Sequence, residues 1–165
     1  MSKQQLHAIL DAIFNAHVQA ELAGDLDETL VTMVPNPHLV NVPTMVGGQR
    51  SQGVRTFYSK RLIGQFFPPD VMFETISRTY SEERLVDELI ISFTHTIKMD
   101  HVLPGIEPTG RRVEAVLVVI VGIEDDKVAY EHISWDQASV LVQLGLLDQK
   151  AFQRTALCAA ANSER

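Results

Sequence analysis

The fold of this chain is decided by residues 93–145, which read FTHTIKMDHVLPGIEPTGRRVEAVLVVIVGIEDDKVAYEHISWDQASVLVQLG. An unbroken apolar run, residues 115–121, lies in the middle of this stretch. Three ionisable residues, His95, His132 and Asp136, lie at the edges of the strand-like segments around the run. Polar groups converging on an apolar hollow are typical of small-molecule sites. The stretch therefore predicts a β-rich core with a candidate site at its edge.

The rest of the chain predicts helices first and strands later. Apolar residues recur at helical spacing near the start and alternate further on. The expected elements are a long first helix closed by Gly24, a second helix from Asp25 to about Met33, a strand at 38–42, a third helix from near Gly53, strands at about 71–79, 84–99, 112–123 and 127–135, a helix at 137–144 and a last short helix around 149–160. This order predicts one α+β domain, residues 1–165, with helices against one curved sheet and a frayed tail at about 161–165.

Composition narrows the class of protein. The chain has 165 residues, of which 45% are hydrophobic and 21% charged, the balance of an ordinary soluble domain. A net charge of −7 argues against nucleic acid, whose phosphates attract basic surfaces. Cys158 is the only cysteine, which excludes internal disulfides and cysteine-rich zinc sites. No apolar run approaches the length of a membrane span, and no signal segment is recognised, so we expect a cytoplasmic protein without a membrane partner.

Alternation along residues 84–99 separates an apolar face from a polar one. Leu89, Ile91 and Phe93 share the apolar face with two ionisable residues, Asp87 and His95. An apolar face packs inward, and a buried ionisable group needs a hydrogen bond, a shifted pKa or a watery pocket. Two interpretations stay open for each residue. Asp87 either lines a pocket or lies at the solvent-washed end of the strand, and His95 is either a site residue or a hydrogen-bonded core histidine.

Residues 115–121 are apolar on both faces, which is unexpected for an antiparallel sheet with one wet side. One face can line the interior, and the other needs a helix or a second subunit to cover it. We therefore expect a homodimer packed sheet to sheet.

The last predicted strand places Tyr130, His132, Ser134 and Asp136 on one face. Asp136 also stands directly before a helix, where a carboxylate commonly caps the free N–H groups. A cap keeps the carboxyl ionised, whereas an acid/base role needs partial burial. The sequence leaves both roles open.

Three segments together resemble a known family. Pro108-Thr109-Gly110-Arg111, Tyr130-Glu131-His132 and residues 136–145 resemble the SnoaL-type polyketide cyclases of the nuclear-transport-factor-two-like, ketosteroid-isomerase-like superfamily. The resemblance implies a cone-shaped α+β barrel, in which a curved mixed or antiparallel sheet wraps around the N-terminal helices. It also implies metal-free, cofactor-free aldol chemistry, with Asp136 as acid/base and His95 and His132 as neighbouring polar groups.

Two functions fit these observations. The first is cyclase- or isomerase-type proton transfer on a small apolar carbonyl compound: Asp136 removes a proton, and His132 or His95 binds the developing enolate. The alternative is a non-catalytic dimeric module that binds a small apolar or aromatic metabolite. The expected lining of the pocket is Asp87, Tyr58, Leu89, Ile91, Phe93, Leu117, Val119, Tyr130 and Ser134.

Two further ideas are weaker. His95, His132 and a carboxylate resemble a two-histidine, one-carboxylate metal set, but no close motif such as His-x3-His supports it, so we expect no metal. His101 lies in the loop before Pro104-Gly105 and could reach the mouth of the pocket, although a solvent-facing role is the simpler expectation.

Overall fold

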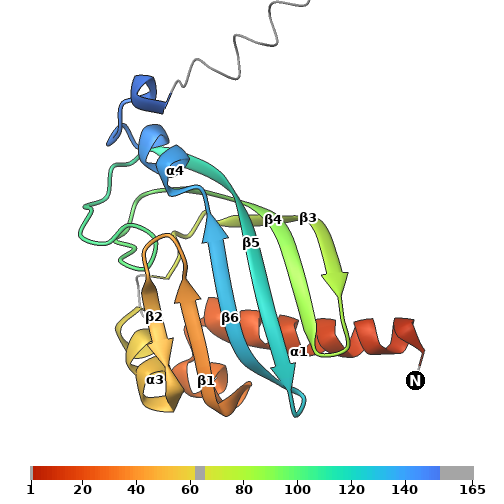
Figure 1. Cartoon of the computed structure of the whole chain (residues 1–165). Helices are drawn as coiled ribbons and strands as arrows, with labels where there is room; N and C mark the ends of the chain where they lie inside the picture. Colours follow the sequence, from red (N-terminus) through yellow and green to blue (C-terminus); the bar gives the residue numbers. More distant parts are fainter. Residues whose placement is uncertain (1, 62–65, 153–165) are drawn as a thin grey trace, which may run out of the picture.

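The structure is a computed structural model that describes residues 2–61 and 66–152. Helices precede and flank a single sheet, in the order helix, helix, strand, strand, helix, four strands and helix (Figure 1). The elements are α1 Lys3–Ala23, α2 Leu26–Val31, β1 Met33–Asn41, β2 Val46–Gln49, α3 Arg50–Arg61, β3 Met72–Tyr80, β4 Arg84–Thr94, β5 Arg112–Glu124, β6 Lys127–Trp135, α4 Gln137–Gln143 and the short 3-10 helix η1 Gln149–Phe152.

The six strands form one mixed sheet in the order β2-β1-β6-β5-β4-β3. β1 pairs antiparallel with β2 and parallel with β6, and the remaining neighbours are antiparallel. α1 crosses one face of the sheet and contacts β6, while α3 packs on β1 and β2 (Figure 1). The expected α+β architecture, a curved mixed sheet with N-terminal helices on its inner face, is confirmed. The sheet is not closed, because β2 and β3 remain its edges.

Helix α1 carries a polar pair on its buried stripe. It begins with a capping box between Ser2 and Gln5 and ends at Gly24, whose φ of 69° is the left-handed conformation that glycine adopts without strain. Between these caps, buried residues recur three or four positions apart, and His17 and Glu21 are among them. The helix therefore directs an imidazole and a carboxyl group towards the sheet.

The register of the three central strands decides which side chains face α1. On β4, Asp87 is buried and pairs with Val119 of β5, which in turn pairs with Ile133 of β6. Val121 of β5 likewise pairs with Glu131 of β6. Because side chains directly opposite each other in a sheet share a face, Glu131 and Ile133 lie on the same inner face as Asp87.

Strand β2 was not expected from the sequence, α3 begins at Arg50 and not near Gly53, and the following boundaries also differ from the expected ones. The strand expected at 84–99 ends at Thr94, because the N–H of Thr96 bonds back to the Thr94 carbonyl at 2.7 Å and turns the chain. β1 begins at Met33 and not at residue 38, although it contains prolines; its pairing with β6 shifts register in that segment, where no ladder N–H is needed. The last helix is the short η1, and the remainder of the expected segment, with the tail at 161–165, lies outside the described residues.

The outer face of the sheet, opposite α1, is partly apolar. Val116 of β5 is 47% exposed, and Val118 and Ile120 alternate with it on the same side. Ile90 of β4 is paired with Val116 and extends the apolar strip across two strands. In Figure 1, no described helix overlies this side of β4, β5 and β6.

The described helices include none that is both long enough and apolar enough to span a membrane.

Candidate functional site

A cavity of about 290 Å³ lies between α1 and the inner face of the sheet. This volume is at the lower end of the roughly 300–1,000 Å³ that is usual for small-molecule sites. Its walls are mainly apolar and aromatic. Of the residues expected to line a pocket, the structure places six on this wall: Asp87, Leu89, Ile91, Phe93, Leu117 and Val119.

Asp87 forms one polar end of the cavity. Its side chain is buried, and its Oδ2 accepts a hydrogen bond from Nη2 of Arg78 at 2.6 Å. Nη1 of Arg78 binds Asp11 on α1 at 2.8 Å, so the guanidinium ties the sheet to the helix. Within the described residues, Oδ1 of Asp87 is buried without a hydrogen-bond partner. The interpretation of Asp87 as a residue at the solvent-exposed end of the strand is therefore wrong, because its carboxyl group is buried and bound by Arg78.

His101 also lines the cavity, although the sequence suggested solvent. Its ring is stacked on Phe66, with centroids 5.0 Å apart, and meets the edge of Phe67 at 5.8 Å. Burial, with a smaller contribution from Arg61, lowers the pKa of His101 to about 3, so the imidazole is neutral. Neither ring nitrogen has a hydrogen-bond partner among the described residues. A neutral imidazole offers one donor and one acceptor, and within the described part of the chain both are available to a ligand.

A second polar group of residues lies at another part of the wall, where Glu21 and Glu131 face the cavity. Nε2 of His17 lies 3.3 Å from Oε2 of Glu131 and 3.4 Å from Oε1 of Glu21. Tyr58 is fully buried behind them and donates its hydroxyl to Oε1 of Glu21 at 2.6 Å. We call His17, Glu21, Glu131 and Tyr58 the His17 cluster.

The proton positions in the His17 cluster follow from its hydrogen bonds. Thr32 donates its hydroxyl to the Thr29 carbonyl, so it can only accept from Nδ1–H of His17, at 2.6 Å. Nε2 faces the two carboxylates and needs a proton of its own. Burial lowers the pKa of His17, but Glu131 and Glu21 outweigh it and raise that pKa to about 10. His17 is thus an imidazolium.

Burial raises the pKa of the Glu131 carboxyl; Glu21 adds to this, and His17 opposes it. Burial likewise raises the pKa of Tyr58 well above its ordinary value, which keeps the phenol a hydrogen-bond donor. The His17 cluster is therefore a hydrogen-bonded network, largely buried, at the wall of the cavity.

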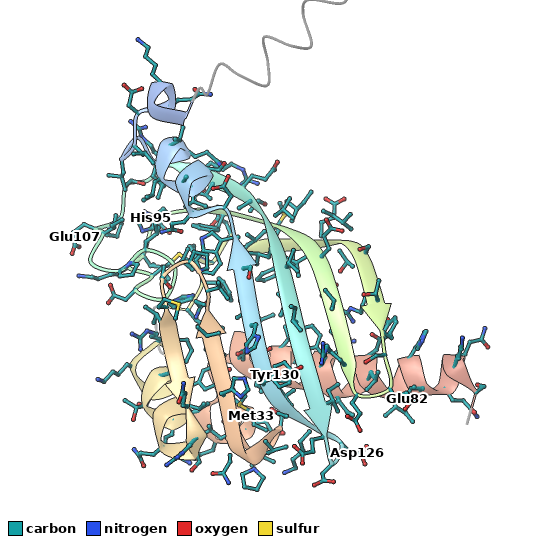
Figure 2. The ribbon with its side chains drawn as sticks, in the orientation of Figure 1. Met33, Glu82, His95, Glu107, Asp126 and Tyr130 are labelled. Carbon is teal, nitrogen blue, oxygen red and sulfur yellow. The ribbon has the colours of Figure 1, made fainter. Side chains whose placement is uncertain are left out.

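The face of β6 that we expected to line the cavity points away from it. The strand turns Tyr130, His132 and Ser134 away from α1, because the register with β5 puts Glu131 and Ile133 inside. On the outer face, Nε2 of His132 lies 3.0 Å from Nε2 of His38. Tyr130, labelled on β6 in Figure 2, stacks on His38 with centroids 5.0 Å apart.

Asp136 and His95 also lie away from the cavity wall. Asp136 is exposed and caps α4, where its Oδ1 accepts from the Ser139 N–H at 3.1 Å. His95 is buried beyond the end of β4 (Figure 2), and its Nδ1 accepts from the Thr109 N–H at 3.3 Å. Burial lowers the pKa of His95. The structure thus places one residue as a helix cap and the other as a core histidine.

Sequence reasoning did not identify Glu131 as a residue of the cavity, and it favoured a solvent-facing role for His101. Glu131 shares its strand face with Ile133 and Trp135, and the rule that apolar faces pack inward would have selected that face. His101 follows β4 in a loop without periodicity, so no pattern marks its direction. Glu21 and His17 are four residues apart on α1, but their meeting with Glu131 depends on a contact between distant segments.

The sequence matches no protein-family model and no curated protein. Solved structures do match. AclR from Streptomyces galilaeus, a candidate hydroxylase, is 21% identical over 97% of this chain and 99% of that chain, with a TM-score of 0.59. IdmH from Streptomyces antibioticus, a candidate polyketide cyclase, is 19% identical; the match covers 82% of this chain and 97% of IdmH, with a TM-score of 0.59. A protein from Catenulispora acidiphila, solved in complex with trimethylamine, is 11% identical; the match covers 81% of this chain and 92% of that protein, with a TM-score of 0.59.

The chain therefore has the fold of the ketosteroid-isomerase-like, nuclear-transport-factor-two-like superfamily. The structural neighbours include a candidate polyketide cyclase, in agreement with the resemblance of the sequence to SnoaL-type proteins. At these identities the likeness shows the fold, and the reaction has to be argued from the cavity.

Proposed function

We propose that the cavity binds a small, largely apolar or aromatic carbonyl compound, that Asp87 removes a proton from it and that His101 stabilises the resulting enolate. In this cyclase- or isomerase-type reaction, Oδ1 of Asp87 takes a proton from the carbon next to the carbonyl. The electrons of that C–H bond form the enolate double bond. The N–H of His101 donates a hydrogen bond to the oxygen on which negative charge develops.

The observation that carries this proposal is the set of buried polar atoms left without partners on an apolar wall. Oδ1 of Asp87 and both ring nitrogens of His101 lack partners in the described part of the chain. An unpaired buried polar atom costs about 1–3 kcal/mol, and a ligand that pairs with it recovers this energy. The favoured ligand has an acidic C–H or donor for the carboxylate and an oxygen for the imidazole.

A second candidate function, binding without turnover, is favoured by the ion pair at Asp87. Nη2 of Arg78 donates a charge-assisted hydrogen bond to Oδ2 of Asp87 at 2.6 Å. The other oxygen of this carboxyl group is then held in place as a hydrogen-bond acceptor for a ligand. The same cavity then selects a ligand that carries a hydrogen-bond donor. One structural neighbour was solved with the small molecule trimethylamine, which is in line with small-molecule binding in this fold.

Proton transfer can be tested before the natural substrate is known. The protein is incubated with 2-tetralone in D₂O, and deuterium uptake next to the carbonyl is followed by NMR against the rate in buffer. We expect the wild-type chain to accelerate uptake and Asp87→Asn to remove at least about 100-fold of the protein-dependent rate. The matched control is Asp136→Asn, which should keep the wild-type rate.

The outcomes separate the two functions. Uptake at the buffer rate, with 2-tetralone bound in the cavity, rejects proton transfer in favour of binding. Loss of deuterium uptake in Asp136→Asn, with full activity in Asp87→Asn, would identify Asp136 as the base and reject Asp87.

We also propose that the protein is a homodimer joined through the outer face of the sheet. Support comes from the apolar strip of Ile90, Val116, Val118 and Ile120, which lies on the side without a described covering helix. Burial of such a strip by a second copy removes apolar area from water.

A further inference from the structure

We infer that His17, Glu21 and Glu131 form a binding site for a divalent cation of the zinc class, open to the cavity. The proposed proton transfer does not use these residues, so the inference stands independently of it. The donor set is one imidazole nitrogen and two carboxylate oxygens, all within 4.8 Å of one another. Zinc sites with an open position commonly use three protein ligands of these types.

The spacing of the donor atoms suits a metal better than a shared proton. Oxygens of Glu131, Glu21 and Tyr58 lie 3.3, 3.4 and 3.3 Å from Nε2 of His17. A charge-assisted N–H···O bond is about 2.7–2.9 Å long, and one N–H cannot point at three oxygens. Ligand atoms about 2.0–2.2 Å from a tetrahedral zinc ion lie about 3.3–3.6 Å from each other. The observed distances from His17 to both carboxylates fall at this spacing.

The residues around the donors hold them in the required orientation. Oγ1 of Thr32 accepts a hydrogen bond from Nδ1–H of His17 at 2.6 Å, which leaves Nε2 as the nitrogen that faces both carboxylates. Tyr58 donates to Oε1 of Glu21 at 2.6 Å and fixes that carboxylate from behind. Hydrogen bonds of this kind commonly orient metal ligands and tune their basicity.

Charge balance points the same way. Two carboxyl groups and one imidazole converge in a buried position, where uncompensated charge is costly. A divalent cation bound between them would offset the charge of the carboxylates. Glu21 and Glu131 also line the cavity, so a bound ion is reachable and can present its open position to a ligand there.

The test uses the full chain without an affinity tag, in a background that removes competing surface donors. The background carries His38→Asn and His132→Asn, because an exposed histidine pair can bind zinc by itself. It also carries Cys158→Ser, because a thiolate is a zinc ligand. Chelator-treated protein is titrated with CoCl₂ and ZnCl₂. We expect one ion per chain, a dissociation constant of about 1 μM or tighter and the intense visible absorption of tetrahedral cobalt. Calorimetry in buffers of different ionisation enthalpy should show release of about one proton per ion, from His17.

Variants within the site separate coordination from general stabilisation. Glu131→Gln and Glu21→Gln keep the shape of the side chain and should each weaken binding at least about 100-fold, and Thr32→Val about 10–100-fold. Asp87→Asn, at another part of the same cavity, should bind like the background. Circular dichroism verifies that each variant is folded. If one of the three site variants does not fold, the affinities of the other two decide whether the ion binds here.

Two results overturn the inference. One is binding weaker than about 1 mM for both ions in the background protein. The other is unchanged affinity in the folded Glu131→Gln or Glu21→Gln protein, which would place the ion elsewhere.

Discussion

Two buried histidines, one with a raised pKa and one with a lowered pKa, set the pH range in which the protein is most stable. Glu131 and Glu21 raise the pKa of His17 from 6.5 to about 10 against the effect of burial. Its stabilising contribution is complete below pH 6.5 and is lost as the pH rises towards about 10. Burial lowers the pKa of His101 from 6.5 to about 3, so its contribution is complete above pH 6.5 and is lost as the pH falls towards about 3.

We therefore predict a stability maximum near pH 6.5 in metal-free protein, measured by urea unfolding in the presence of a chelator. His17→Gln should flatten the alkaline side of the curve, and His101→Gln the acid side. A His17→Gln protein that still loses stability between pH 6.5 and 10 as steeply as the wild type contradicts the assignment of the imidazolium.

The sequence predicts the direction of some side chains correctly and of others incorrectly. Alternation placed Asp87 on the inner face of β4, because four apolar neighbours fix that face. On β6 both faces carry polar side chains, and we expected His132 to face the cavity, although Ile133 and Trp135 mark the face of Glu131 as the more apolar one. The pairing with β5 shows that the face of Glu131 is the inner one. The contact of His17 with Glu131 joins residues 114 positions apart, which no local pattern encodes.

At the scale of elements, α4 depends on its cap. Asp136 accepts from the Ser139 N–H at 3.1 Å, and an Ncap aspartate contributes about 1 kcal/mol to stability. We predict that Asp136→Ala lowers the free energy of unfolding by about this amount and leaves deuterium uptake by 2-tetralone unchanged. Asp25→Ala, which removes the equivalent cap of α2, is the matched comparison. Equal stability of wild type and Asp136→Ala contradicts the capping role.

The elements themselves follow from the sequence more readily than their ends. Helical spacing and Gly24 locate α1, and the polar turn after β5 locates β6. The end of β4 and the start of β1 depend on a local turn at Thr96 and on a register shift beside β6. These are tertiary hydrogen bonds, so intrinsic preferences cannot place them.

At the scale of the whole molecule, the outer face of the sheet predicts the oligomeric state. Val116 lies on the apolar strip and is 47% exposed. A lysine there places a charge in the proposed interface, where desolvation opposes association. We predict a dimer for the wild type by light scattering at micromolar concentration and a folded monomer for Val116→Lys. Met45→Lys, at a 78% exposed position on the β1–β2 turn, should remain dimeric. A monomeric wild-type protein contradicts this proposal.

The fold explains why one chain carries a cavity and a free sheet face together. α1 covers the inner face and closes the cavity through Asp11 with Arg78 and through His17 with Glu131. The apolar run on β5 then supplies the cavity wall from alternate residues and the outer strip from the others. The run suggested both surfaces in the sequence, and alternation placed Asp87 inside, but the contact of His17 with Glu131 depends on the tertiary fold.

The most direct test of the central claim, that the cavity beside Asp87 and His101 is the functional site, is a crystal structure of the protein with 2-tetralone. We predict that the ketone lies inside the cavity, with its oxygen about 2.6–3.2 Å from a ring nitrogen of His101 and its neighbouring carbon facing Oδ1 of Asp87. A ketone bound beside Asp136 or on the outer face, with the cavity unchanged, would contradict it.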